Sequence, residues 1–132
     1  MLRSKTILVI DRNAYVALDL ASEIEQRGGR VAGPVVTADE ALTHLAADPV
    51  DGAILDADII GASAIAASLT HRRIPFVLQA GAALPAPLRR LCDPAAVLVR
   101  PVDSALVLSL LAAEVDKADE PSPPSPPMPL QQ

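Results

Sequence analysis

Five short apolar runs, rich in Val, Ile and Leu, alternate with longer amphipathic segments along the chain. Continuous apolar runs of this length are typical of strands that are covered on both faces, as in a parallel sheet. Strict alternation of such strands with helices predicts an α/β fold, in which one doubly wound, five-stranded parallel sheet carries helices on both faces. The expected strands are 5–10, 30–36, 51–56, 74–79 and 96–99. Sheets of this kind place their binding sites at the carboxyl ends of the strands.

The segments between the strands carry helix signals of different strength. Thr37 followed by Glu40 forms a capping box, which predicts the start of the second helix. Pro85 and Pro87 leave room for only a short or irregular fourth helix. Pro34 favours an edge or strand-end position for the second strand. The expected helices are 13–27, 37–47, 62–71, 88–91 and a last one that begins after residue 103.

The last helix has a clear start and an apolar face. Asp103 is expected to cap it, because an aspartate at this position accepts hydrogen bonds from the first helical amides. Leu106, Leu110 and Val115 recur at roughly helical spacing and are therefore expected to share one face of the helix.

The composition limits the classes of partner and compartment. The 132 residues include 51% hydrophobic side chains, enough for one core, and carry a formal net charge of −5. The eleven basic residues are scattered, whereas nucleic-acid binding needs a clustered basic face, so we expect no nucleic-acid partner. No apolar run approaches the roughly 20 residues that span a bilayer, so we expect no membrane partner. A single cysteine, Cys92, and the absence of a signal-like segment favour a cytoplasmic protein without an internal disulfide.

The composition changes after Ala118. Residues 119–132 carry six of the thirteen prolines and few apolar side chains, so this segment cannot bury a core. The predicted division is one domain over residues 1–118 and a disordered or polyproline II tail over residues 119–132. The tail is either a solubilising end or linker, or a ligand for a proline-binding partner.

Charged residues at the ends of three predicted strands carry a resemblance to a known family. The first strand is followed by Asp11, the third ends in Asp56, and the fifth is followed by Arg100 and Pro101. In this order and spacing, over residues 4–116, they resemble the receiver domains of response regulators, the CheY-like superfamily.

The resemblance implies a fold, a reaction and partners. The fold would be flavodoxin-like with strand order 2-1-3-4-5, and the segment 74–81 is similar to a subclass with a weak fourth helix. In receivers, a phosphoryl group passes from the histidine of a kinase or phosphotransferase to the aspartate that ends the third strand, which is Asp56 here. The chain would then be a signalling domain in a two-component phosphorelay, not an enzyme, and would have no catalytic residue of its own. Its output would come from contact with an unknown protein target through the fourth helix, fifth strand and fifth helix, with Leu106 and Val107 among the contributors.

The residues around the phosphoacceptor position depart from the family pattern. Receivers end the first strand with two acidic residues that bind Mg²⁺, whereas Asp11 is followed here by Arg12. The formal charges of Asp11, Arg12, Asp56 and Arg100 sum to zero, whereas three carboxylates and one lysine sum to minus two. A cation next to the metal position should weaken binding by orders of magnitude, so Asp11 and Asp56 should bind Mg²⁺ weakly or not at all, and no other cofactor is expected. Arg12 either pairs with Asp56 or remains a solvated loop residue.

Further substitutions affect the conformational switch that the resemblance implies. Ala80 stands where receivers carry the hydroxyl that senses the phosphoryl group, and Val97 stands where many carry an aromatic ring. Arg100 takes the place of a lysine, which keeps the charge but differs in reach and shape. Pro101 is a candidate for the cis peptide bond that is typical of the family.

Other reactive side chains have ordinary explanations. His44 and His71 lie on or just beyond helices, away from the strand ends, and are expected at the surface. Cys92 has no basic or histidine constellation near it and is expected to pack as a small apolar side chain. Tyr15 lies in the first turn of a helix near the expected site, where a packing role is favoured over a partner contact.

Three functions are compatible with these residues. The first, which we favour, is an atypical single-domain receiver, or pseudo-receiver, that acts by protein–protein contact with impaired Mg-dependent phosphorylation. The second is a working phosphoacceptor in which Arg12 and Arg100 replace the metal and the lysine, which predicts labelling of Asp56. The third is a flavodoxin-like cofactor-binding enzyme. The loop at residues 11–15 disfavours it, because no glycine there lets a phosphate approach the backbone. The oligomeric state, the cognate kinase and the target stay open.

Overall fold

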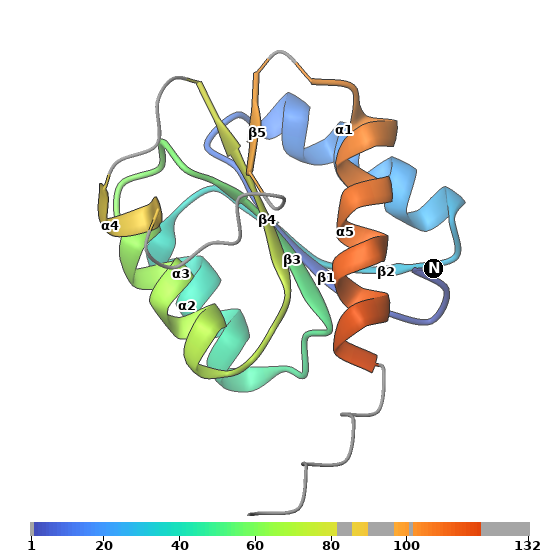
Figure 1. Ribbon diagram of the computed structural model, residues 1–132, viewed down its shortest axis with the longest axis horizontal. Coiled ribbons are helices and arrows are strands. Elements are labelled where there is room, and N and C mark those ends of the chain that lie inside the picture. Colours follow the sequence, from blue (N-terminus) through green and yellow to red (C-terminus); the bar gives the residue numbers. More distant parts are fainter. Residues whose placement is uncertain (1, 82–85, 90–96, 101, 120–132) are drawn as a thin grey trace, which may run out of the picture.

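A five-stranded sheet forms the centre of the computed structural model, which describes residues 2–81, 86–89, 97–100 and 102–119 (Figure 1). The strands are β1 (Thr6–Ile10), β2 (Arg30–Val35), β3 (Gly52–Asp56), β4 (Phe76–Ala80) and β5 (Val97–Val99). The helices are α1 (Ala14–Gln26), α2 (Ala38–Ala47), α3 (Ala62–His71), α4 (Ala86–Arg89) and α5 (Ser104–Asp119). The strand order is β2-β1-β3-β4-β5 with every pair parallel, which confirms the predicted doubly wound sheet.

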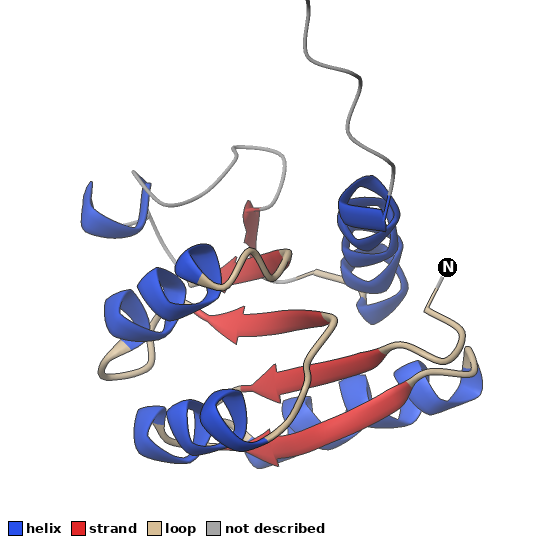
Figure 2. Ribbon diagram, turned by 90° about the horizontal axis from the view of Figure 1, so that it is seen from below, coloured by secondary structure: helices blue, strands red, loops and turns tan. Residues whose placement is uncertain are grey.

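Helices cover both faces of the sheet (Figures 1 and 2). Helices α1 and α5 pack against one face, and α2 and α3 pack against the other. The side chains of β1 alternate between the two layers: Ile7 and Val9 contact the α1 and α5 layer, whereas Leu8 and Ile10 contact the α2 and α3 layer. All four are fully buried, which explains why this strand is continuously apolar and shows no polar alternation.

Helix α5 lies very close to the start of β3. A Cβ atom at Gly52 would lie 3.0 Å from Val115 Cγ2 and 3.2 Å from Ile7 Cδ1. The glycine therefore permits a close contact, which a Cβ atom would tighten until these side chains gave way by a few tenths of an ångström. This contact holds the C-terminal helix against the strand that carries Asp56.

The three α5 residues that were predicted to share one face differ in burial. Val115 is buried and Leu110 is partly buried, but Leu106 is 54% exposed. The buried residues are Val107, Leu108, Leu111 and Val115. The run Leu-Val-Leu-Ser-Leu-Leu is apolar on more than one side of a helix, so its spacing alone does not select a face. The predicted cap is confirmed, because Asp103 Oδ1 accepts the backbone N–H of Ala105 at 3.2 Å.

Helix α2 begins at the predicted cap, Thr37, whose side chain also pairs with that of Glu40. The backbone N–H of Glu40 donates to Thr37 Oγ1 at 3.2 Å, and the Thr37 hydroxyl donates to Glu40 Oε1 at 3.0 Å. Thr37→Ala is expected to lower the free energy of unfolding by about 1 kcal/mol, because the Glu40 amide loses its acceptor. Thr43→Ala, on the exposed side of the same helix, is the matched control and should change it by less than about 0.5 kcal/mol. Urea denaturation measures both, and equal losses would contradict the capping role.

Strand β2 lies at an edge of the sheet, as its proline predicts, and the Gly33–Pro34 peptide bond is cis. A short α4 is present at 86–89, close to the predicted 88–91. The predicted cis bond before Pro101 and the predicted packing of Cys92 lie outside the described residues, as does the tail beyond Asp119.

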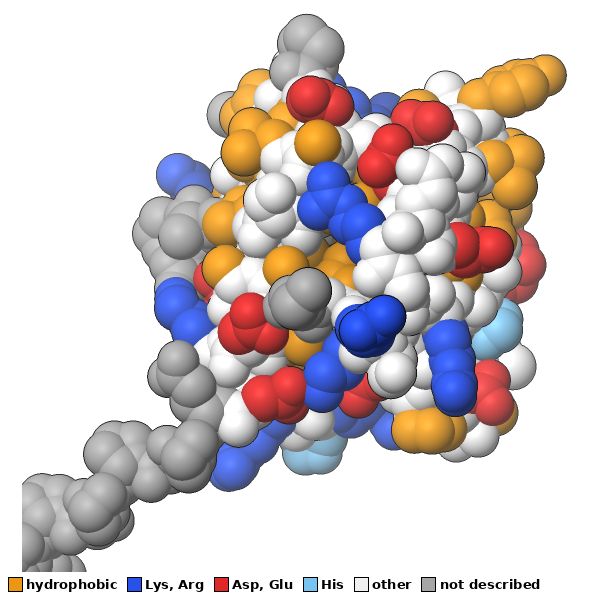
Figure 3. Space-filling view, turned by 90° about the vertical axis from the view of Figure 1, so that its right-hand side faces the viewer, with side chains coloured by type: hydrophobic (Ala, Val, Ile, Leu, Met, Phe, Trp, Pro, Cys, Tyr) orange, Lys and Arg blue, Asp and Glu red, His pale blue; other side chains and the backbone are white. Residues whose placement is uncertain are grey.

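Charges of both signs share the face of the molecule on the α1 and α5 side. On this face, Lys and Arg side chains are intermingled with Asp and Glu (Figure 3).

Within the described part of the chain, no helix has the length and apolar character that a membrane crossing requires.

Candidate functional site

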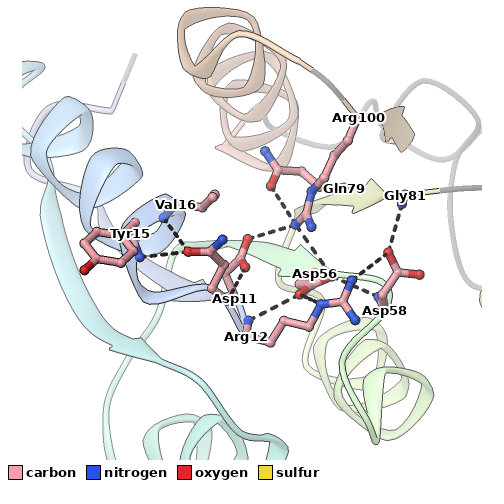
Figure 4. Close-up of polar contacts among 10 residues, drawn as sticks. Asp11, Arg12, Tyr15, Val16, Asp56, Asp58, Gln79, Gly81 and Arg100 are labelled. Atoms are coloured by element: carbon pink, nitrogen blue, oxygen red, sulfur yellow. Dashed lines mark hydrogen bonds and ion pairs between the residues drawn. The ribbon is translucent and has the colours of Figure 1, made fainter.

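The carboxyl ends of three strands bring together the polar side chains that are buried in the described residues. Asp11 follows β1 and is 1% exposed, Asp56 ends β3 and is 0% exposed, and Gln79 on β4 is 3% exposed. The parallel register places Asp56 directly beside Gln79. Arg12 lies just after β1 and Arg100 just after β5, and both side chains reach this cluster (Figure 4). The structure therefore gathers Asp11, Arg12, Asp56 and Arg100, as their places at the strand ends predict.

Both carboxylate oxygens of Asp56 are already engaged. Oδ2 accepts the backbone N–H of Arg12 at 3.2 Å and lies 3.3 Å from Nε of the same residue. Oδ1 accepts the backbone N–H of Asp58 at 2.9 Å and lies 3.5 Å from Arg100 Nη2. Of the two alternatives for Arg12, the structure thus shows the ion pair with Asp56. The side chain of Arg12 is nevertheless 56% exposed, so this partner of Asp56 borders solvent.

Asp11 is held in the same manner. Its Oδ1 accepts the backbone N–H of Asn13 at 2.8 Å, and its Oδ2 accepts a hydrogen bond from Arg100 Nη2 at 2.8 Å. Arg100 therefore bridges Asp11 and Asp56, with the shorter contact to Asp11. Its side chain is 25% exposed, so most of this bridge is withdrawn from water.

Gln79 is a site residue that the sequence reasoning missed. Its Oε1 accepts a hydrogen bond from Arg100 Nη2 at 3.3 Å, so that nitrogen has a second hydrogen-bond acceptor besides Asp11, in addition to its ion pair with Asp56. A buried amide is costly unless it is hydrogen-bonded, so this contact explains a glutamine in an otherwise apolar strand. That lone polar residue within the run 74–79 was the available signal.

Asp58 is the second residue that was missed. Its Oδ2 accepts the backbone N–H of Gly81 at 2.9 Å and lies 3.7 Å from Arg12 Nη2 (Figure 4). Asp58 also borders an open groove of about 430 Å³ beside the site, which is lined by Arg12, Val36, Thr37, Ala38, Asp39, Asp58, Ile59 and Ile60. An acidic residue two positions after Asp56 was the available signal.

Burial controls the ionisation of Asp11. Withdrawal from water raises the pKa of Asp11 above its ordinary value of 3.8, and the charge of Asp56 acts in the same direction. The N–H of Asn13 and the guanidinium groups of Arg100 and Arg12 oppose this rise in the pKa without cancelling it. The folded protein therefore holds a proton on Asp11 more readily than the unfolded chain does.

The raised pKa of Asp11 predicts a pH-dependent difference between the wild type and Asp11→Asn. As the pH rises above 3.8, the unfolded chain loses this proton first, so the wild type loses stability relative to the variant until the raised folded pKa is passed. Below 3.8 the two proteins should differ least in charge, and this loss is absent. Urea denaturation of both proteins over a pH series measures the difference. A wild type that gains stability relative to the variant over the same interval would contradict the prediction.

Mg²⁺ would have to compete with two arginines for the carboxylates of Asp11 and Asp56. Mg²⁺ requires oxygen ligands in near-ideal octahedral geometry, with free lone pairs directed at the ion. Here the carboxylates of Asp11 and Asp56 face the guanidinium groups of Arg12 and Arg100 instead. Among the described residues, no three His, Cys, Asp or Glu side chains are grouped in a way that could hold a metal ion.

The other residues that the sequence singled out differ in how far they are exposed. Ala80 ends β4, is 2% exposed and has no hydroxyl to offer, and Val97 on β5 is partly buried against the core. Tyr15 is 86% exposed, so its predicted packing role is wrong: it lies on the outer side of the first turn of α1. His71 is exposed, whereas His44 is only partly exposed, with Nδ1 3.4 Å from Asp48 Oδ2.

Comparisons of sequence find no relative for this chain. Neither the protein-family models nor the curated protein sequences include a match.

Comparisons of structure find many similar chains. A response regulator receiver domain (CheY-like) from Methanospirillum hungatei JF-1 superposes with a TM-score of 0.77 at 18% identity, over 88% of this chain and 97% of that chain. A response regulator receiver protein from Sinorhizobium medicae WSM419 gives a TM-score of 0.74 at 21% identity, over 90% and 100% of the two chains. A Burkholderia pseudomallei response regulator with a phosphorylated aspartic acid, calcium ion and citrate gives a TM-score of 0.68 at 23% identity, over 86% and 70%. The protein therefore has the fold of the CheY-like response-regulator receiver domains.

Proposed function

We propose that the protein is an atypical receiver of two-component signalling, which acts through protein–protein contacts and whose Asp56 is closed to Mg-assisted phosphorylation. The observation that carries the proposal is the engagement of every carboxylate oxygen of Asp11 and Asp56. Each of these four oxygens accepts a backbone N–H or pairs with a guanidinium group, at distances of 2.8–3.5 Å. The partners would be a histidine kinase or phosphotransferase and a protein target. No enzymatic activity is part of the proposal.

The chemistry of phosphoryl transfer explains why this arrangement closes the site. An aspartate that attacks phosphorus needs a free oxygen lone pair, and the charge that develops on the phosphoryl oxygens needs a cation on the far side of them. Nε of the Arg12 guanidinium lies 3.3 Å from Asp56 Oδ2, which supports the proposal that Arg12 occupies the space that an entering phosphoryl group would need. Entry therefore requires that Arg12 leave and that its ion pair with Asp56 be broken.

Two exposed apolar side chains on β5 and α5 support the proposed protein contacts. Val99 is 60% exposed and Leu106 is 54% exposed. Val107, the other residue predicted for this surface, is fully buried and cannot contribute to it. The two exposed apolar side chains support an output through contact with a protein target.

Labelling with a small phosphodonor tests the proposal. The full chain is incubated with phosphoramidate and Mg²⁺, and the intact mass is followed against an Asp56→Asn control. We expect no phosphoryl adduct that depends on Asp56. A stoichiometric adduct that requires both Asp56 and Mg²⁺ would overturn the proposal.

A second candidate is supported by the same guanidinium groups. Arg12 Nε and Arg100 Nη2 lie 3.3 Å and 3.5 Å from the two oxygens of Asp56, so they could bind phosphoryl oxygens in place of a metal and a lysine. This candidate is a working phosphoacceptor. It predicts labelling at Asp56 that continues in the presence of EDTA, which the favoured function does not.

A further inference from the structure

Asp58 connects the arginine-occupied site to the chain that leaves β4. Its backbone N–H donates to Asp56 Oδ1 at 2.9 Å, which ties it to the centre of the site. Its side chain points the other way along the sheet edge and accepts the N–H of Gly81, the residue that follows β4, at 2.9 Å (Figure 4). One residue thus joins two loops that are 23 positions apart in the sequence.

The packing at Gly81 shows that this contact is close. A Cβ atom at this position would lie 3.0 Å from Asp58 Oδ2. That distance is tighter than nine in ten real Cβ contacts, so beside a larger residue the Asp58 carboxylate would have to give way by a few tenths of an ångström. The absence of a side chain at residue 81 therefore lets the carboxylate sit directly on the backbone amide.

Arg12 shares the same carboxylate oxygen. Its Nη2 lies 3.7 Å from Asp58 Oδ2, while its Nε lies 3.3 Å from Asp56 Oδ2. The guanidinium group is therefore placed between the buried aspartate and the aspartate that holds Gly81. Any movement of Arg12 away from Asp56 changes the charge environment of the oxygen that binds the Gly81 amide.

We propose that Asp58 is a positioning residue that fixes the backbone after β4 to the site and transmits displacement of Arg12 to it. The inference builds on the proposed function, since Arg12 is common to both. Ala80 offers no hydroxyl, so the side chain of residue 80 cannot report the state of the site to this loop. The Asp58 carboxylate supplies a link that needs no phosphoryl group. The consequence is that the position of the Gly81 backbone depends on Arg12 and on whatever partner displaces it.

Hydrogen exchange at one amide tests the first half of the proposal. The exchange rate of the Gly81 amide is measured by NMR in the full chain, without metal or phosphodonor, for the wild type, Asp58→Ala, Asp58→Asn and Asp39→Ala. Asp58→Ala removes the acceptor and should accelerate exchange at Gly81 about tenfold, the effect of losing a hydrogen bond to a charged group. Asp58→Asn keeps an acceptor and should retain most of the protection.

The control for this experiment is Asp39→Ala. Asp39 lines the same groove from the first turn of α2, so the variant removes a neighbouring negative charge without removing the acceptor of the Gly81 amide. It should leave exchange at Gly81 unchanged. If Asp58→Ala also leaves exchange at Gly81 unchanged, the positioning role is overturned.

A double-mutant comparison tests the second half. Made in the wild-type background, Arg12→Ala should shift the Gly81 amide resonance. Made in the Asp58→Ala background, the same substitution should leave this resonance nearly unchanged. Equal shifts in both backgrounds would show that Arg12 reaches Gly81 by another route and would overturn the transmission. Both experiments are made without phosphodonor, so a protein that proves to be phosphorylated on Asp56 can still pass or fail them independently.

Discussion

Replacing Arg100 with methionine is expected to lower the free energy of unfolding by about 3 kcal/mol at neutral pH. Arg100 Nη2 is the guanidinium partner of Asp11 at 2.8 Å and contacts Asp56 at 3.5 Å, and these two carboxylates are 1% and 0% exposed. Without Arg100 two buried negative charges face each other with fewer partners. We expect the lower end of the range for broken buried pairs, because Arg100 itself is 25% exposed and water can enter the space it leaves.

Two further variants show whether this loss comes from the charges. Arg30→Met removes an exposed arginine from the edge strand β2 and should change the free energy of unfolding by less than about 0.5 kcal/mol. Asp11→Asn in the Arg100→Met background removes one of the two uncompensated charges and should restore part of the loss. Chemical denaturation of the four proteins measures these differences. If Asp11→Asn does not reduce the loss caused by Arg100→Met, Arg100 acts through packing alone.

Arg12→Asp is expected to raise the affinity for Mg²⁺ by at least about a hundredfold. The substitution removes a cation from the side of Asp56 and adds a carboxylate, so the local charge changes by two units. A unit charge at about 4 Å contributes roughly 4 kcal/mol at a protein-like dielectric. The side chain of Arg12 is 56% exposed, so water screens its charge and the expected gain in Mg²⁺ affinity is smaller than this figure implies. The backbone N–H of residue 12, which also binds Asp56, is retained in the variant.

Isothermal titration with Mg²⁺ measures this gain against Arg30→Asp, which makes the same change of charge in the exposed first residue of β2. Only the Arg12 variant should bind more tightly than the wild type. Equal affinities in the two variants would mean that Arg12 does not keep the metal out, and the closed site would need another explanation.

The fold follows from the sequence because the strands are buried on both faces. The stretches 7–10 and 53–55 are continuously apolar for that reason, and the alternation of such strands with capped helices leaves few topologies. The meeting of Asp11, Asp56 and Arg100 is predictable by the same rule, since all three stand at carboxyl ends of parallel strands. Periodicity failed at Leu106, where several consecutive apolar residues allow more than one buried face.

The finer contacts of the site depend on geometry that the sequence does not carry. Gln79 belongs to the site only because β4 pairs with β3 in a register that places it beside Asp56. Asp58 reaches Gly81 only because the loops after β3 and β4 lie together at the sheet edge. Tyr15 was expected to pack, but the first turn of α1 directs it to solvent. The first two contacts join segments that are far apart in the chain. The third depends on the direction in which a side chain leaves its helix.

Titration of the ¹⁵N-labelled chain with Mg²⁺ and then beryllofluoride, with Asp56→Asn as the control, tests the closure of Asp56 most directly. Beryllofluoride binds an accessible aspartate as a mimic of the phosphoryl group, so it reports whether Asp56 can be reached at all. We predict no saturable shift of the backbone amides of residues 11, 56 and 81 in the wild type. A saturable shift of these amides that disappears in Asp56→Asn would contradict the closed site and would identify the protein as a working phosphoacceptor.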